Sequence, residues 1–231
     1  KVYPPSLRKI FQRNEFERSK TNLAKIGWLS LMIDRIKHEL KNGGAVVLPT
    51  ETVYGLFAKA LDKKAVDHVY QLKRRPRDKA LNLNVASLDD ILNFSKNQPP
   101  YLQKLVDSFL PGPLTIILEA NDKVPYWVNS DLNTVGFRMP SHPITLELIR
   151  ECGPLIGPSA NISGCKSGLN FKQILEDFDR EVLGIEDDGF LTGQDSTILD
   201  LTGKKVKILR QGSITQEDIL TEIPEIPFEE V

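Results

Sequence analysis

The densest group of ionisable side chains is the run Lys73-Arg74-Arg75-Pro76-Arg77-Asp78-Lys79, which holds five cationic side chains in seven residues. Such a run repels itself, so it is either solvated or faces an anion. Lys73 and Arg75 lie just before Pro76, which favours an extended backbone that can direct both side chains to one place. Guanidinium groups grip phosphate oxygens through paired hydrogen bonds, and an ammonium acts as a point charge. The run therefore predicts a polyphosphate site.

Two further segments place polar side chains where predicted strands end. Residues 49–56 (PTETVYGL) follow a buried strand, at the point where α/β sheets bind ligands, and residues 157–164 (GPSANISG) follow a second short apolar strand. A purely structural interpretation stays open for both, because Thr and Ser cap helices and Gly-Pro pairs make turns. For Glu51 we favour capping or the orientation of a neighbouring group over a role as general base.

Several common kinds of site are missing from the sequence. It contains neither GxxxxGK[ST] nor GxGxxG, so a nucleotide must bind by a route other than a P-loop or a Rossmann turn. No GxSxG elbow occurs. The histidines and cysteines lie far apart without metal-ligand spacing, which argues against zinc; they are His38, His68, His142, Cys152 and Cys165.

The elements that must position these segments alternate irregularly between strands and helices. Strands are predicted at 45–48, 81–85, 114–118, 134–139, 196–201 and 206–209, and Asn82 and Asn84 lie on the wet or cavity-facing side of the second. Helices are predicted at 28–41, from an N-cap at Asp62 toward Pro76, after a capping box at Ser87, and at 99–110, 143–152, 171–178 and 215–223. This order favours an α/β domain with a twisted, mixed parallel and antiparallel sheet flanked by helices.

Composition agrees with a globular enzyme-sized domain. The chain has 231 residues, 40% of them hydrophobic and 26% charged, and a formal net charge of −1. A chain of this length can bury one full core without disulfides, so disorder, collagen and small disulfide scaffolds are excluded. Two cysteines, no membrane-length apolar stretch and no signal-peptide pattern predict a cytoplasmic protein without membrane association.

Six motifs in order resemble the YrdC-like threonylcarbamoyl-AMP synthase family in its single-domain form. They are LPTETVYGL (48–56), LKRRP (72–76), PGPLT (111–115), RMP (138–140), PSAN (158–161), and ST (196–197) with LRQG (209–212). The resemblance runs from about Leu29 to Leu220. It implies a YrdC-like fold with a central cationic cavity. We expect an N-terminal extension at 1–27, a catalytic domain at 28–222 and an acidic tail at 223–231.

The resemblance implies a nucleotidyltransferase that converts L-threonine, bicarbonate and ATP into L-threonylcarbamoyladenylate and pyrophosphate. Mg²⁺ is the implied cofactor, carried by the ATP phosphates without a dedicated protein cage. The product serves the modification of the adenosine beside the anticodon in tRNAs that read codons beginning with A. It would pass to tRNA-modifying transferase proteins, and a direct tRNA contact is left open.

The resemblance also implies roles for single residues. The signature pairs Lys73/Arg75 and Ser159/Asn161 are expected to be catalytic and to hold the triphosphate, with Ser159 and Asn161 as neutral hydrogen-bond donors. Further nucleotide contacts are expected from Arg138 and Arg210, although an ion pair explains Arg138 equally well. The residues expected near threonine are Thr50, Tyr54, Arg77, Thr134 and Ser196.

One position departs from the family pattern. Asn84 stands where many relatives have histidine, and an amide cannot take a proton near neutral pH, so we expect no proton transfer there.

Two other functions remain open for this sequence. The alternatives are a non-catalytic RNA-binding module, which would use the basic cavity to read shape, and a YrdC-fold paralogue of different activity. Pyrophosphate release that needs threonine and bicarbonate separates the enzyme from the binding module.

Overall fold

The computed structural model describes residues 27–229. Apart from Gly27, the predicted extension at 1–27 lies outside the described residues, as do the last two residues of the predicted tail. The chain divides into two compact units, 1–38 and 39–231. Residues 27–41 are helical, which confirms the helix predicted at 28–41. All residues of the site described below belong to the second unit.

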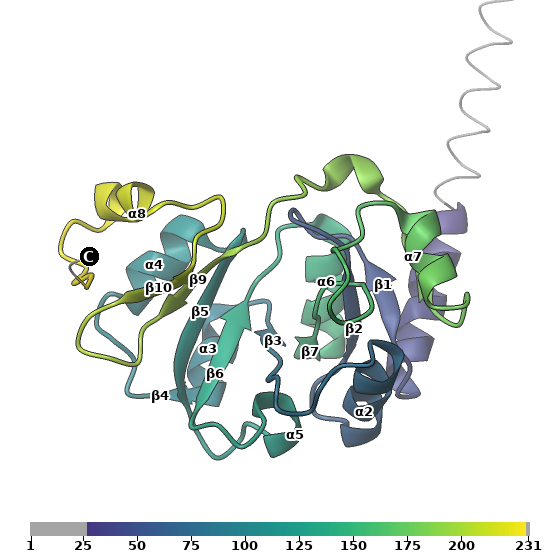
Figure 1. Cartoon of the computed structure of the whole chain (residues 1–231), viewed down its shortest axis with the longest axis horizontal. Coiled ribbons are helices and arrows are strands. Elements are labelled where there is room, and N and C mark those ends of the chain that lie inside the picture. The colour runs from purple at the N-terminus through teal and green to yellow at the C-terminus, as the bar shows by residue number, and fades with distance from the viewer. Residues whose placement is uncertain (1–26, 230–231) are drawn as a thin grey trace, which may run out of the picture. The chain divides into compact units, whose positions relative to one another are not determined.

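Across the described residues, ten strands form one mixed sheet in the order β10-β9-β5-β6-β3-β7-β2-β1-β8, with β4 paired to β5 (Figure 1). Three pairs, β1·β8, β3·β6 and β5·β9, are parallel and the others are antiparallel, which confirms the predicted mixed sheet. The strands are β1 Val46–Leu48, β2 Gly55–Lys59, β3 Leu83–Asn84, β4 Ser95–Lys96, β5 Leu114–Ala120, β6 Thr134–Arg138, β7 Leu155–Ile156, β8 Leu183–Gly184, β9 Thr197–Asp200 and β10 Lys207–Arg210.

Two helices of the second unit begin at polar caps that the sequence indicates. Asp62 accepts hydrogen bonds from two backbone amides at the start of α2, and Ser87 accepts one from Asp90 at the start of α3. None of the helices within residues 27–229 has the length and apolar character needed to cross a membrane. The helices are α2 Lys63–Leu72, α3 Leu88–Phe94, α4 Leu102–Phe109, α5 Tyr126–Asn129, α6 Pro143–Cys152, α7 Phe171–Asp177, η1 Asp188–Phe190 and α8 Gln216–Glu222.

Five short elements were not predicted: β2, β4, β8, α5 and η1. The strand β2 begins only seven residues after β1 ends and pairs with it antiparallel, so residues 49–54 form a tight connection and Gly55 already belongs to a strand. The other four have between two and four residues. Such short segments carry no periodic pattern of apolar residues, and only their neighbours in the sheet define them.

The sheet register aligns five polar or cavity-facing positions across five neighbouring strands. Arg210 of β10 is paired with Ile198 of β9, Ile198 with Thr115 of β5, Thr115 with Arg138 of β6, and Arg138 with Asn84 of β3. Residues in one such row point to the same face of a sheet. The row brings together positions from 84 to 210 of the sequence, and it forms the floor of the site.

Candidate active site

One cavity of about 350 Å³ lies over this row. Its volume is in the range of pockets for small molecules. Three guanidinium groups and one carboxylate line it, those of Arg75, Arg138, Arg210 and Asp195. The remaining lining residues are Thr50, Val53, Tyr54, Gly55, Ala80, Leu81, Asn82, Asn84, Thr115, Gly157, Pro158, Ser159, Ser167, Ser196 and Ile198.

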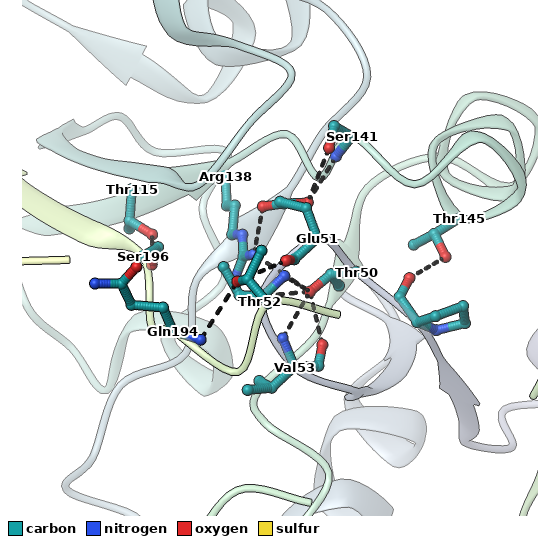
Figure 2. Close-up of polar contacts among 12 residues, drawn as sticks. Thr50, Glu51, Thr52, Val53, Thr115, Arg138, Ser141, Thr145, Gln194 and Ser196 are labelled. Atoms are coloured by element: carbon teal, nitrogen blue, oxygen red, sulfur yellow. Dashed lines mark hydrogen bonds and ion pairs between the residues drawn. The ribbon is translucent and has the colours of Figure 1, made fainter. Parts of the chain in front are cut away.

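The loop between β1 and β2 forms one wall and holds Arg138 in place (Figure 2). Glu51 Oε1 accepts a hydrogen bond from Arg138 Nη2 at 2.6 Å, and Glu51 Oε2 accepts one from the Ser141 amide at 2.8 Å. The same Nη2 lies 2.6 Å from Thr52 Oγ1. Arg138 therefore forms the ion pair that the sequence left open, and Glu51 orients a neighbouring group, as favoured above.

Although it is paired, Arg138 keeps one unused donor. Its Nε is buried and has no hydrogen-bond partner among the described residues. A buried N–H without a partner is uncommon, and a ligand or a water molecule ordinarily satisfies it. Arg138 therefore lines the cavity while it pairs with Glu51, and one of its donors has no partner among the described residues.

Tyr54 is fixed from behind by the segment after β8. Its hydroxyl donates to Asp188 Oδ1 at 2.7 Å and accepts a hydrogen bond from the Asp187 amide at 2.7 Å. Burial, followed by the hydrogen bond to Asp188, raises the pKa of the Tyr54 phenol, so the phenol stays protonated. The same segment is attached to the β1–β2 loop, because the Thr192 and Gly193 amides donate to the carbonyls of residues 51 and 52.

Thr50 also has internal partners. Its hydroxyl donates to the Val53 carbonyl at 2.6 Å and accepts from the Thr52 and Val53 amides, which closes the loop into a turn. Thr50 and Tyr54 thus line the cavity with side chains whose orientation is set before any ligand binds.

Lys73 lies behind the cavity, and its side chain does not line it. The residue is 1% exposed, and its ammonium contacts the Ser159 carbonyl, the Asn161 carbonyl at 2.6 Å and Asn161 Oδ1 at 3.5 Å. Burial, and secondly the charge of Arg75, lowers the pKa of Lys73 to about 7. A neutral amine still has two N–H groups for the two closer carbonyls, so the contacts do not require the charged form.

Of Ser159 and Asn161, too, only one residue lines the cavity. Ser159 lines the cavity, whereas all polar side-chain atoms of Asn161 have partners within the protein. Its Oδ1 accepts from Ser159 Oγ, and its Nδ2 donates to the carbonyls of Ile162 and Cys165 at 3.0 and 2.8 Å. The two signature pairs are therefore brought together, and each contributes one residue to the cavity and one to its support.

Arg75 is the cavity-lining member of the first pair. Its Nε donates to the Lys79 carbonyl at 3.1 Å and its Nη2 to the Ala80 carbonyl at 2.8 Å. Within residues 27–229 the guanidinium has no carboxylate partner, so its charge stays available for an anion.

On another wall of the cavity, Ser196 connects Arg210, which was predicted as a site residue, to Thr115, which was not. Arg210 donates to the Ser196 carbonyl at 2.9 Å and to Ser196 Oγ at 3.0 Å, and Ser196 Oγ lies 3.0 Å from Thr115 Oγ1. Arg210 also lies 3.6 Å from Asp195.

Two of the residues expected near threonine lie away from this cavity. Arg77 pairs with Asp67 at 2.6 Å and lies 4.4 Å from the centre of the Tyr70 ring, in a separate surface cavity. Thr134 begins β6 and is paired with Glu119, four residues before Arg138 and therefore at the opposite end of the strand from the cavity. Neither residue lines the cavity.

The structure adds Thr115, Ser167 and Asp195 to the cavity. Thr115 lies within a motif quoted above, and no pattern in the sequence indicates Ser167 or Asp195 as site residues. Asn84 also lines the cavity, as its alternating strand pattern predicts, and it donates weakly to the Leu155 carbonyl at 3.4 Å. Within residues 27–229, no group of three or more His, Cys, Asp or Glu side chains is arranged to hold a metal ion.

The mixed sheet, with an arginine-lined cavity over its central strands, defines a YrdC-like α/β domain. The chain belongs to the Sua5/YciO/YrdC family, whose model, described as "Telomere recombination", matches residues 38–212. This confirms the resemblance that the six motifs indicate.

Known relatives agree with this membership. The chain is 40% identical over 189 residues to the threonylcarbamoyl-AMP synthase of Pyrococcus abyssi, covering 81% of this chain and 56% of that protein. It is 39% identical to the Bacillus subtilis threonylcarbamoyl-AMP synthase, covering 78% and 53%. The crystal structure of P. abyssi Sua5 complexed with L-threonine superposes with a TM-score of 0.79 at 38% identity, covering 85% of this chain and 58% of that one. The chain thus spans little more than half of these relatives.

Proposed function

We propose that this protein is a threonylcarbamoyl-AMP synthase, a nucleotidyltransferase that forms L-threonylcarbamoyladenylate and pyrophosphate from L-threonine, bicarbonate and ATP. The observation that carries the proposal is the cavity lined by Arg75, Arg138 and Arg210 beside the hydroxyl-rich loops. The names of the two relatives and the threonine complex of P. abyssi Sua5 support it.

The proposed chemistry requires little covalent participation by the protein. The neutral threonine amine attacks the carbon of bicarbonate, and one C–O bond breaks as an amine proton and the hydroxyl group leave together as water, which gives the carbamate. A carbamate oxygen then attacks the α-phosphorus of ATP while the bond to the leaving pyrophosphate breaks. Negative charge accumulates on the phosphate oxygens, so fixed cationic donors and correct positioning supply most of the acceleration. The described cavity offers no exposed nucleophile activated by a base, which agrees with catalysis by positioning and by stabilisation of negative charge.

Each arginine is held by a different set of acceptors, which orients the cavity charge in advance. Arg75 is bound by two backbone carbonyls, Arg138 by Glu51 and two threonine hydroxyls, and Arg210 by Ser196. We assign these three arginines to the triphosphate. Donors that are fixed before the reaction need no reorganisation when charge develops.

Mg²⁺ fits this cavity as an ion that enters with ATP. It prefers oxygen ligands and keeps several waters, so two or three phosphate oxygens and water can hold it. Asp195 is the carboxylate of the cavity lining, and it is the side chain that would contact such an ion or its waters. When bound, Mg²⁺ would neutralise phosphate charge and favour the departure of pyrophosphate.

We further propose a cytoplasmic location and transfer of the product to tRNA-modifying proteins. The carbamoyl adenylate is a reactive mixed anhydride, so a downstream transferase must accept it before water does.

Pyrophosphate release by the purified protein tests the function. With Mg-ATP, release should require both L-threonine and bicarbonate, and omission of either should reduce it to background. Mass spectrometry should detect threonylcarbamoyladenylate in the complete mixture. Release that is independent of threonine, or the absence of release in the complete mixture, would contradict the proposal.

A further inference from the structure

The segment between β8 and β9 ends in two residues of the cavity lining, Asp195 and Ser196. We call residues 186–194 of this segment the strap. The strap lies entirely within the described residues, η1 is its one regular element, and most of its residues are exposed. A segment with so little buried surface opens easily unless specific contacts hold it. Those contacts therefore decide how firmly this part of the cavity is built.

The strap is attached to the wall of the cavity that the β1–β2 loop forms. The Asp187 amide donates to the Tyr54 hydroxyl at 2.7 Å. Further along the strap, the amides of Thr192 and Gly193 donate to two backbone carbonyls of the loop at 3.0 and 2.8 Å. Each of these single hydrogen bonds contributes little, because water competes for the same groups. Tyr54 is therefore fully held only while the strap stays in place.

A buried histidine outside the cavity lining also holds the strap. His142 is the N-cap residue of α6, and its side chain is 3% exposed. Its Nε2 lies 3.2 Å from Asp187 Oδ2, and its ring meets that of Phe190 edge to face, with the ring centres 4.6 Å apart. Both partners belong to the strap. His142 thus gives an exposed segment a contact point in the interior of the protein.

The support on which His142 stands is itself fixed to the β1–β2 loop (Figure 2). The Ser141 amide donates to Glu51 Oε2 at 2.8 Å, and Thr145 Oγ1 donates to the Pro49 carbonyl at 2.7 Å. These bonds flank His142 on both sides in the sequence. The histidine therefore connects the strap to the same loop that the strap amides contact.

The contact with Asp187 determines where the His142 ring carries its proton. An ionised carboxylate only accepts hydrogen bonds, so Nε2 must be the donor. Nδ1 is buried and has no hydrogen-bond partner among the described residues. A buried N–H without an acceptor is costly, so a ring with its proton on Nε2 alone fits this place. What the strap requires from position 142 is a single N–H donor at the end of the side chain.

We propose that His142 is a positioning residue for the proposed reaction. It holds the strap through Asp187 and Phe190, and the strap in turn keeps Tyr54 in the orientation that it presents to a ligand. A ligand that meets a loosened strap must order it on binding, so loss of His142 should weaken binding more than it slows the chemical step. The inference rests on the proposed function only for its kinetic test, because the state of the strap can be measured without turnover.

Amide hydrogen exchange, followed by mass spectrometry of peptides that cover residues 186–194, tests the contact directly. His142→Phe keeps a ring against Phe190 but removes the N–H, and it should speed exchange of the strap about tenfold. His142→Gln restores an N–H and should bring exchange back to within about threefold of wild type. His68→Phe, a matched histidine substitution on α2, should leave the strap unchanged. Wild-type exchange in His142→Phe, or equally fast exchange in the Phe and Gln variants, would overturn the proposal.

A second variant removes the partner instead of the histidine. Asp187 is half-exposed, so Asp187→Ala disturbs the interior less than a change at His142, and the backbone amide that contacts Tyr54 remains. It should speed exchange of the strap to a similar extent. Thermal unfolding establishes which variants are folded, and if His142→Phe is not, Asp187→Ala carries the test. Unchanged exchange in folded Asp187→Ala would refute the anchoring role.

Steady-state kinetics of pyrophosphate release gives a readout that a general loss of stability would not produce. His142→Phe and Asp187→Ala should each raise KM for L-threonine about tenfold and change kcat less than about threefold, and His142→Gln should restore KM. A fall in kcat at unchanged KM would contradict the proposal. If wild-type protein releases no pyrophosphate, the proposed function fails, and the exchange of the strap still decides the role of His142. If wild type turns over but the variants leave exchange and KM unchanged, only the inference about His142 fails.

Discussion

The ion pair between Glu51 and Arg138 allows a quantitative prediction. Glu51→Ala removes the acceptor of Arg138 Nη2 at 2.6 Å and that of the Ser141 amide at 2.8 Å. The two paired side chains are 12% and 15% exposed, so Arg138 loses its charged partner in a largely desolvated place and keeps only the threonine hydroxyls. Removing one partner of a buried pair costs about 3–5 kcal/mol. Because Arg138 lines the cavity and can recruit water there, we expect the lower end, about 3 kcal/mol.

Urea unfolding measures this loss through the midpoint at constant m-value. Glu51→Gln keeps one oxygen acceptor but presents an NH₂ group to a second donor, so about half of the loss is expected. The matched control is Glu147→Gln, which breaks an exposed pair with Arg150 and should cost less than about 1 kcal/mol. If Glu51→Ala costs no more than this control, the ion pair does not hold the loop, and the reasoning is refuted.

Three further predictions concern the same cavity. Between pH 7 and about 10 the unfolded chain holds a proton on Lys73 that the folded chain tends to release. The free energy of unfolding of wild type, relative to that of Lys73→Met, should therefore rise with pH by at most about 1.4 kcal/mol per pH unit. Urea unfolding at pH 6.5 and at pH 9 measures this change, and a fall with pH would contradict the prediction. Tyr54→Phe leaves the Asp187 amide without its acceptor and should cost about 1–3 kcal/mol of unfolding free energy, whereas a cost near zero would mean that water replaces the phenol. Arg75→Ala should reduce pyrophosphate release at least about 100-fold and Arg77→Ala should not, because Arg75 lines the cavity and Arg77 pairs outside it; equal losses would contradict the placement.

Helices and the longer strands follow from local patterns. Asp62 and Ser87 act as N-caps where the sequence indicates, because a side-chain oxygen beside an unpaired backbone amide is a local arrangement. The strands β5 and β6, with seven and five residues, have enough length to show a pattern. The two-residue strands β3, β4, β7 and β8 depend on partners that are distant in sequence, and their limits can be recognised only in the assembled sheet.

In the functional site, too, some features are predicted by the sequence and others are defined only by the fold. The motifs identify Arg75, Ser159, Ser196 and Arg210 as site residues, and all four line one cavity. Arg77 shares the basic run with Arg75 and looks equivalent in sequence, but the backbone after Pro76 directs it to Asp67. Thr134 shares a strand with Arg138, but a rise of about 3.3 Å per residue carries it to the far end.

By itself, the sequence determined the family, the mixed α/β class and the two signature pairs, because these depend on residue type and order along the chain. The tertiary structure decided which member of each pair faces the cavity: Arg75 and Ser159 line it, while Lys73 and Asn161 support it. The physical reason is that the orientation of these side chains is set by hydrogen bonds between segments that lie far apart in the sequence. The single proton of Ser159 and the fixed amide of Asn161 acquire their orientation only when residues 73 and 159–165 meet in the folded protein.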